Sequence, residues 1–348
     1  MGIKILTSVT PKSERMRKEY VIGTHGGIFH SDEVVAVAIL CLLHKNEKVR
    51  IVRTRDMSIL NECDICVDVG GGEYDHHQKG FNLCRRDDLR LKKERIPYAS
   101  AGLIWKQYGE KLICKLLPDY FTEILNSGFD LLYVPTSAWR IIDDGMISNV
   151  DAEDNGIDVN GHTFSYVSSY LPLWFDDNYD EQFMKVLKVT INILEAKIVN
   201  TVEKCISEIV LRTRWNKRGS IEELIKGTCT FSDNILHIPS QTVPWLSAVA
   251  GMNIIAIVVP YRENAINFVI FPYPAGGWAA QCVPPSLEKK FDKRVPFPKE
   301  WAGQTDKLPE ISGVADATFC HNGCFFVRAQ SKRGVIKMCI KAMMLARN

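Results

Sequence analysis

Two short histidine-rich segments near the start of the chain hold the residue types best suited to metal chemistry. They span residues 21–33 and 66–77 and contain four of the eight histidines in the sequence. Imidazole and carboxylate groups together suit divalent ions such as manganese or zinc. We therefore interpret the clustering as a metal site rather than a packing device. The candidate ligands are His25, His30, Asp32, Asp68 and His76, and His77 follows directly.

Such a set of residues favours hydrolysis of phosphate esters. Two metal ions about 3.5–4 Å apart lower the pKa of a bound water and clamp the phosphoryl oxygens. The alternative is that the histidines cap turns and make hydrogen bonds in the core. That alternative suits a single histidine, whereas four histidines with two aspartates, all at predicted strand ends, favour a functional site.

The first segment is predicted to lie at the edge of a sheet. The apolar residues 20–22 end at a glycine, as a buried strand would, and the next glycines allow a sharp turn. Residues 34–43 are apolar on every side and predict a buried helix, with Ser31 as its cap. Open α/β sheets bind ligands at the carboxyl ends of their strands. The loop there would carry His25, His30 and Asp32.

The second segment repeats this arrangement. Residues 65–67 form a predicted strand with Asp68 at its end. Before it, residues 48–54 alternate as a strand should, and residues 56–62 suit a short helix. The order strand, helix, strand, helix, strand predicts a parallel sheet and an α/β fold. Asp68 should therefore face the same edge of the sheet as the first segment.

A third acidic group follows a predicted helix. We expect helices over 100–117, 120–134 and 137–150, and the last one leads to Asp151 and Asp154. Acidic residues at the C-terminal end of a helix oppose its dipole, and a bound cation would offset that cost. A solvated acidic helix end is the alternative. The pattern does not decide which of the two aspartates binds metal.

The overall charge gives no argument for a nucleic-acid partner. The formal net charge is +2, so any basic surface must be local. Residues 85–95 form a basic run, which we interpret as a solvated surface loop, with contact to phosphate groups as the alternative.

The sequence has no apolar run of 18 residues, so we expect no membrane association. Its eleven cysteines are scattered and no signal peptide is apparent, which indicates reduced thiols inside a cell. We expect a cytoplasmic or nuclear protein, with a mitochondrial address as the alternative because the N-terminus is basic. The oligomeric state is left open.

At 348 residues, the chain is expected to form two domains. Apolar residues at helical spacing predict a long connecting helix over 181–213. The second half is β-rich, with strands expected at 235–238, 254–261, 265–271 and 279–283, a tight turn at 321–323 and a final helix over 331–347. We divide the chain into a metal-binding domain over 1–180, a connecting helix over 181–221 and a smaller α+β domain over 222–348.

The ordered motifs resemble a known family. Residues 75–77, Asp-His-His, match the signature of the DHH phosphoesterase superfamily. The longer strings resemble one branch of it, the melanocyte-proliferating-gene-one family. The matching strings are 23–33, 68–71, 75–81, 101–105, 151–156, 244–245, 276–278 and 321–325. The resemblance covers nearly the whole chain.

The resemblance implies an architecture similar to that of RecJ-type exonucleases. An N-terminal DHH domain with a doubly wound parallel sheet would carry two metal ions, and a smaller C-terminal domain would bind substrate. The branch is associated with manganese-dependent 3′–5′ exonuclease action on RNA, in nucleus and mitochondria. The implied partner is the 3′ end of a single-stranded RNA.

The resemblance also assigns roles to residues. His25 and His30 would hold one ion, while Asp32 and His76 would hold the other together with Asp151 or Asp154. Asp68 would bridge both ions, and His77 would orient or protonate near the scissile phosphate. The substrate-binding candidates are His321, Asn322, Gly323 and Lys79. Many superfamily members have Asp where His30 stands, so the site here carries less negative charge.

Two alternatives to an exoribonuclease are kept. One is a phosphoesterase acting on short oligonucleotides, small nucleotides or pyrophosphate. It is kept because a long single strand needs a basic or aromatic channel, and the near-neutral net charge gives only modest support for one. The other, from a different class, is a non-catalytic metal- or RNA-binding regulatory protein. Substitution of Asp68 separates this last alternative from the enzymes, because a vestigial site would lose no hydrolysis.

Overall fold

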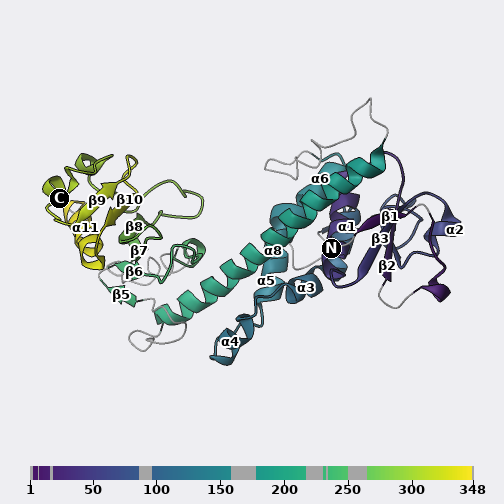
Figure 1. The fold of residues 1–348 in the computed structure, drawn as a ribbon, viewed down its shortest axis with the longest axis horizontal. Helices are drawn as coiled ribbons and strands as arrows, with labels where there is room; N and C mark the ends of the chain where they lie inside the picture. Colours follow the sequence, from purple (N-terminus) through teal and green to yellow (C-terminus); the bar gives the residue numbers. More distant parts are fainter. Residues whose placement is uncertain are drawn as a thin grey trace. The chain divides into compact units, whose positions relative to one another are not determined.

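The computed structural model describes residues 3–6, 8–15, 19–85, 96–157, 178–216, 230–232, 234–249 and 265–346 (Figure 1). The chain divides into two compact units. The first comprises Met1–Asp119 and Leu132–Val202, and the second comprises Tyr120–Leu131 and Glu203–Asn348. Among the described residues, no helix is both long and apolar enough to cross a bilayer.

The first unit contains a four-stranded parallel sheet. Its strands are β1 (Lys4–Leu6), β2 (Glu19–Thr24), β3 (Lys48–Arg53) and β4 (Ile65–Cys66), in the order β1-β3-β2-β4. The parallel sheet predicted from the sequence is confirmed. Strand β1 was not predicted, because three residues are too few to display an alternating pattern. It extends the sheet by pairing with β3.

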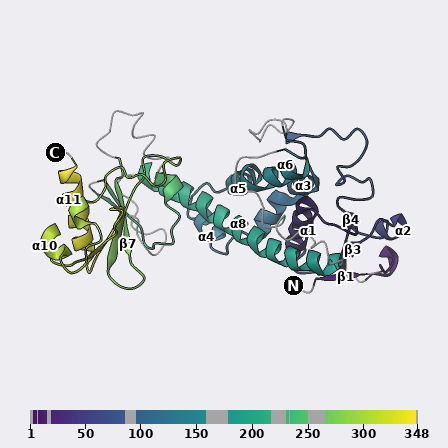
Figure 2. The ribbon, with the colours of Figure 1, turned by 90° about the horizontal axis from the view of Figure 1, so that it is seen from above.

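Helix α1 (Ser31–Leu43) is buried along its whole length, as its apolar sequence predicts. It packs against α3 (Ser100–Lys115), and both contact α6 (Ser148–Asp154). Figure 2 shows these three helices grouped beside the sheet. The short helix α2 (Met57–Leu60) precedes β4, and Asp56 caps its N-terminus through the backbone N–H of Ser58.

The helices between residues 121 and 154 differ from those predicted. Helix α4 covers only Phe121–Asn126, because Gly128 adopts a left-handed conformation and ends it. Helix α5 (Val134–Ile142) begins early, with a proline in its first turn, and a wider π-helical turn (Asp143–Ile147) leads into α6. Single-turn π segments of this kind occur often near functional sites. Helix α6 continues to Asp154, so both candidate aspartates lie on it.

Helix α8 (Tyr179–Asn216) covers the long helix predicted over 181–213, and its residues are divided between the two units after Val202. The second unit is built on a six-stranded mixed sheet in the order β5-β6-β7-β8-β10-β9. Strands β6 and β7 are parallel, and the other neighbours are antiparallel. The strand bounds are Thr230–Ser232, Ile235–His237, Phe268–Pro272, Trp278–Cys282, Ala317–Cys320 and Phe326–Ala329, for β5 to β10. The predicted strand at 254–261 lies outside the described residues.

Two helices pack on the sheet of the second unit. They are α10 (Leu308–Ser312) and α11 (Lys332–Leu345), which contact β9 and β7 to β10 respectively. The predicted C-terminal helix is thereby confirmed. Single-turn helices at Lys12–Glu14 and Lys299–Trp301 complete the described elements. The predicted turn at 321–323 joins β9 to β10. Each unit thus pairs a sheet with packed helices, and the fold is mixed α/β.

Candidate metal centre

Asp68 lies at the centre of the candidate site. It follows β4 in a left-handed backbone conformation with φ of 58°, which is uncommon for a residue with a side chain. Two contacts hold it there: its N–H donates to the Tyr74 carbonyl at 3.0 Å, and its Oδ1 accepts from the Ser100 hydroxyl at 3.0 Å. Because Ser100 begins α3, that helix fixes the direction of the carboxylate.

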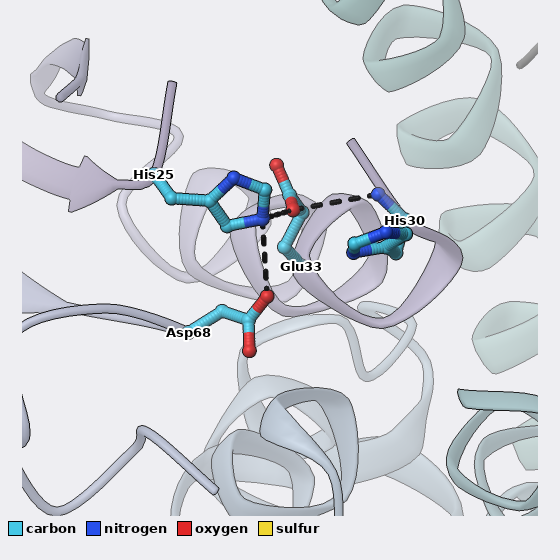
Figure 3. A group of neighbouring side chains, drawn as sticks. All are labelled: His25, His30, Glu33 and Asp68. Atoms are coloured by element: carbon cyan, nitrogen blue, oxygen red, sulfur yellow. Dashed lines mark hydrogen bonds and ion pairs between the residues drawn. The ribbon is translucent and has the colours of Figure 1, made fainter. Parts of the chain in front are cut away.

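A first group of ligands gathers around Asp68 (Figure 3). His25 directly follows β2, and its Nδ1 lies 3.2 Å from the Gly26 carbonyl. A proton on Nδ1 would satisfy that carbonyl, so Nε2 is the nitrogen directed into the site. It lies 3.3 Å from Asp68 Oδ2 and also contacts the Glu33 carboxylate. Ligand atoms of His25, His30, Glu33 and Asp68 all lie within 4.8 Å of one another, close enough to share one ion.

Two further groups continue from the first. His76 Nε2 lies 3.2 Å from Asp68 Oδ1, 3.2 Å from Asp154 Oδ2 and 3.8 Å from Asp32 Oδ2. One group comprises Asp68, His76 and His77, and another comprises His30, Asp32 and Asp154. Asp68 and His30 each belong to two of the three groups. The groups therefore form one continuous cluster of residues that could hold a metal ion.

The electrostatics of the cluster favour a bound cation. Burial, and next the neighbouring charges of Asp68 and Asp154, raise the pKa of Asp32 well above its ordinary value. Burial likewise raises the pKa of Glu33 and of Asp154. One buried oxygen, Asp32 Oδ1, accepts no hydrogen bond, and Asp68 Oδ2 has the His25 ring nitrogen 3.3 Å away. Unsatisfied buried carboxylate oxygens are costly, and metal coordination would satisfy them.

The histidines respond to the same charges in the opposite direction. Burial alone would lower the pKa of His25, but its hydrogen bonds with Asp68 and Glu33 raise that pKa to about 10. Burial opposes the charge on His76 too, yet Asp68 and Asp154 raise its pKa. Burial would raise the pKa of Asp68, but hydrogen bonds from the two histidines hold it well below its ordinary value. Without an ion, protons bound to the histidines therefore balance part of the negative charge.

Asp151 and Asp154 lie on the same helix but have different partners. Asp154 contacts His76 in the cluster. Asp151 instead accepts a hydrogen bond from Arg85 Nη1 at 2.7 Å and another from the Gly102 N–H at 2.9 Å. It belongs to none of the groups whose ligand atoms could hold an ion, among the residues the structure describes.

Arg85 is fully buried, which corrects the prediction of a solvated basic loop for this residue. Its guanidinium also hydrogen-bonds both oxygens of Asp143 at 2.9 and 3.1 Å and lies 4.7 Å from the centroid of the Tyr98 ring. The rest of the predicted loop, 86–95, lies outside the described residues. The sequence pattern could not distinguish the buried Arg85 from exposed basic residues, because Asp143 and Asp151 approach it only in the folded structure.

Glu33 is a member of the cluster that the sequence analysis did not select as a ligand. It lies in the first turn of α1, where an acidic residue is favoured by the helix dipole without any ion. Its side chain is fully buried, and its Oε1 lies 3.5 Å from Arg53 Nη2. Arg53 also pairs with Asp180 at 2.9 Å and lies against the rings of Phe29 and Phe183. The available signal was the apolar character of the rest of α1, which requires that a carboxylate there be buried.

The remaining candidates lie elsewhere. Asp75 shapes the turn before the two histidines, since its Oδ2 accepts from the Gly71 N–H at 2.8 Å and its Oδ1 from the His77 N–H at 3.0 Å. Lys79 follows in the first unit and is exposed. The other three substrate-binding candidates belong to the exposed turn between β9 and β10 in the second unit. They are His321, Asn322 and Gly323.

Comparison with known proteins assigns the chain to a family. The family model named MYG1_exonuc, described as "Uncharacterised protein family (UPF0160)", matches residues 21–343. The MYG1 exonuclease of Mus musculus is 30% identical over 94% of this chain and 87% of its own length. The MYG1 exonuclease of Homo sapiens is 28% identical over 94% of this chain and 88% of its own length. The MYG1 protein of Schizosaccharomyces pombe is 30% identical over 94% of this chain and 98% of its own length.

A solved structure, CDC45 from Entamoeba histolytica, spans 95% of this chain and 96% of its own, at 10% identity and a TM-score of 0.23, and carries no inference about the fold. The family model and the relatives cover most of the chain, including both histidine-rich segments. By these matches, the protein described here is a member of the MYG1 family.

Proposed function

We propose that this chain is a metal-dependent exonuclease that hydrolyses phosphodiester bonds with two divalent ions. The observation that carries the proposal is the overlap of three ligand groups through Asp68 and His30. The buried Asp32 Oδ1, which accepts no hydrogen bond, supports it independently. The names of the mouse and human relatives, MYG1 exonuclease, agree with this chemistry. Two ions so placed would supply a deprotonated water near neutral pH and a charge clamp on the phosphate.

In this proposal each histidine-rich segment contributes ligands to both metal-ion positions. His25, His30 and Glu33 belong to the first position, and Asp32 and His76 belong to the second, while Asp68 is shared. Asp154 is the last ligand of the second position, because its oxygen lies 3.2 Å from His76 Nε2. Asp151 is the less suitable choice, because both its oxygens already accept hydrogen bonds from Arg85 and Gly102.

His77 is proposed to act on the leaving group. Its side chain is 60% exposed, whereas that of His76 is 8% exposed, so His77 is the histidine that a substrate can reach. Its Nδ1 lies 3.2 Å from Asp75 Oδ1 and 3.3 Å from Asp68 Oδ1. A carboxylate at this distance orients an imidazole through a hydrogen bond. His77 would thereby donate a proton to the leaving oxygen.

The finer assignments follow the family resemblance. We propose manganese as the metal, single-stranded RNA as the substrate and 3′–5′ polarity. We propose a doubly wound catalytic domain of the DHH type over 1–180, joined by 181–221 to a substrate-binding domain over 222–348. In that plan Lys79 and the 321–323 turn contact the substrate. Carboxylate oxygens and imidazole nitrogens together are ligands that suit a divalent ion such as manganese.

One assay tests these assignments together. RNA of about 20 nucleotides, labelled at either end, is incubated with the protein and Mn²⁺, and a dinucleotide is run in parallel. We expect a ladder of shortening products from 5′-labelled RNA and released mononucleotide from 3′-labelled RNA, both lost with EDTA. Cleavage of the dinucleotide alone would favour the short-substrate alternative. No metal-dependent cleavage, with Asp68→Asn identical to the parent, would favour a regulatory protein.

A further inference from the structure

A pair of thiols lies immediately before Asp68 in the sequence. Cys63 and Cys66 form a Cys-x-x-Cys sequence that links α2 to β4. The Cys63 thiol donates to the Ile59 carbonyl at 3.6 Å, and the Cys66 thiol donates to the Leu60 carbonyl at 3.4 Å. Cys63 is 3% exposed and Cys66 is half-buried, so Cys66 is the more accessible residue of the two.

The surrounding chain is built to leave room for both sulfurs. Gly23, in the interior of β2, lies beside them, and a Cβ atom there would be 3.0 Å from each Sγ. A glycine inside a strand often marks such a close approach. Asp64, between the two cysteines, pairs with Arg15 at 2.7 Å and accepts from the Val21 N–H at 2.7 Å. This clamp holds the segment that carries the thiols against β2.

A metal-binding role for the pair is not supported. Neither cysteine belongs to a group of three or more ligands, among the residues that the structure describes. The other close pair, Cys320 and Cys324, is buried in the core of the second unit, where an oxidant has no access. Cys63 and Cys66 are therefore the pair suited to reversible covalent chemistry.

We propose that Cys63 and Cys66 are a modification site at which a small disulfide, such as oxidised glutathione, closes a reversible intramolecular disulfide that weakens metal binding at Asp68. The Cys66 sulfur attacks one sulfur of the oxidant, and one glutathione leaves as a thiol. The Cys63 sulfur then attacks the Cys66 sulfur and releases the second glutathione. Two electrons and two protons pass from the protein thiols to the oxidant, and one disulfide bond replaces another.

The coupling to Asp68 runs through two residues of backbone. Bonded sulfurs must approach to about 2.05 Å, so closing the disulfide pulls Cys66 toward Cys63. Cys66 is paired with Gly23 in the sheet, and the next N–H, of Val67, donates to the Gly23 carbonyl at 2.9 Å. Asp68 follows in its left-handed conformation, a narrow region for a residue with a side chain. A shift of β4 therefore turns the carboxylate away from His25 and His76. This last step rests on the proposed function.

The test uses the full chain, reduced with a phosphine or treated with excess oxidised glutathione. Peptide mass mapping should show a loss of two hydrogens in the peptide that contains Cys63 and Cys66, without retained glutathione. Mn²⁺ titration by calorimetry should show about tenfold weaker binding after oxidation, restored by the reductant. The Cys63→Ala/Cys66→Ala variant should bind Mn²⁺ as the reduced parent does and should not respond to the oxidant.

The exposed Cys114 supplies a matched control. Cys114→Ala should keep the full response of the parent. Absence of the internal disulfide, or its formation with unchanged Mn²⁺ affinity, would overturn the proposal. If the reduced protein binds no Mn²⁺, the two-metal function is wrong instead, and the mass measurement still decides whether the disulfide forms.

Discussion

At the scale of single residues, the site depends on carboxylates that are buried before any ion binds. Asp32, Glu33 and Asp68 are each at most 2% exposed, and burial is the largest influence raising the pKa of the first two. Such groups destabilise the protein unless cations or protons balance their charge. Because His30 is neutral when it binds an ion, Glu33 is important for the charge of the first ligand group. It adds a second carboxylate to that group.

The first prediction concerns Glu33. Glu33→Gln keeps the shape of the side chain and its capacity to accept a hydrogen bond from His25, but it removes the charge. We expect Mn²⁺ affinity to fall at least about tenfold. Calorimetric titration measures this, with Glu47→Gln, on a half-exposed surface residue after the same helix, as the control. An affinity equal to that of the parent would show that Glu33 only orients His25.

The second prediction concerns pH. The folded-state pKa of His25 is raised to about 10 from an ordinary value of 6.5. Its charge therefore stabilises the metal-free protein fully below pH 6.5, and this contribution disappears as pH rises through 10. A bound ion requires neutral His25, so metal binding should release protons and strengthen as pH rises across the same range. Thermal melts in EDTA and titrations in two buffers of different ionisation enthalpy measure both effects. The prediction would be contradicted if the metal-free parent showed the same stability at every pH, as His25→Asn is expected to do.

At the scale of elements, α3 and α6 hold the ligands in place through a buried ion-pair network. Arg85 joins Asp143, before α6, to Asp151 within it, and Gly102 on α3 donates to Asp151. The same α6 carries Asp154, and the same α3 carries Ser100, which hydrogen-bonds Asp68. The network therefore acts on two ligands without touching an ion.

The third prediction is that Arg85→Met destabilises the protein strongly. The substitution leaves two buried carboxylates unpaired, and breaking such a network costs about 3–5 kcal/mol. Chemical denaturation measures the loss. Arg140→Met, on the exposed face of α5, is the matched control and should change stability by less than about 0.5 kcal/mol. Equal effects of the two substitutions would rule out the network as a stabilising element.

The fourth prediction concerns the close approach of α3 to α6. A Cβ atom on Gly102 would collide with the Asp151 carboxylate and would lie 2.7 Å from the Tyr98 ring. Gly102→Ala should therefore destabilise the protein by about 1–3 kcal/mol, despite the better helix propensity of alanine. A Cβ atom on Gly145 would meet no neighbour within 4 Å, so Gly145→Ala should be tolerated. The melting temperatures of the two variants measure these effects. A Gly102→Ala variant that melts at the same temperature as the parent would contradict the close packing of α3 against α6.

The elements around the site also show what the sequence can and cannot reveal. The apolar runs of β2, α1 and β4 are long or distinct enough that the parallel sheet and the position of His25 and Asp68 follow from the pattern. The sequence could not show which of Asp151 and Asp154 is the better candidate ligand, because both lie on one helix. Their partners differ only because Asp151 pairs with Arg85, 66 residues earlier in the chain. Glu33 was not predicted as a ligand, because an acidic residue in the first turn of a helix is already explained by its favourable interaction with the helix dipole.

At the scale of the whole molecule, the chain forms two units, and the second unit has a core of its own. The ligands of the three groups all belong to the first unit, and the 321–323 turn belongs to the second. The sequence predicted the long helix α8 and the β-rich character of the second half. It could not predict the strand pairing there, because β8 pairs with β10, whose partner residues lie 45 to 51 positions further along the chain (Phe326 opposite Gln281, Ala329 opposite Trp278).

The fifth prediction separates the units functionally. His321→Ala should slow degradation of RNA by about tenfold while leaving Mn²⁺ affinity unchanged, because this exposed residue lies outside the ligand groups. The rate on labelled RNA and the calorimetric affinity are measured on the same preparation. His237→Ala, a substitution of the same type in the second unit, serves as the control. Loss of metal binding in His321→Ala would contradict the division of labour.

The central claim is that one cluster binds two divalent ions through a shared Asp68. Calorimetric titration of the metal-free protein with Mn²⁺ tests it most directly. We predict two ions per chain for the parent and loss of high affinity at both positions in Asp68→Asn. A parent protein that binds no Mn²⁺, or an Asp68→Asn variant that still binds two ions with unchanged affinity, would contradict the account.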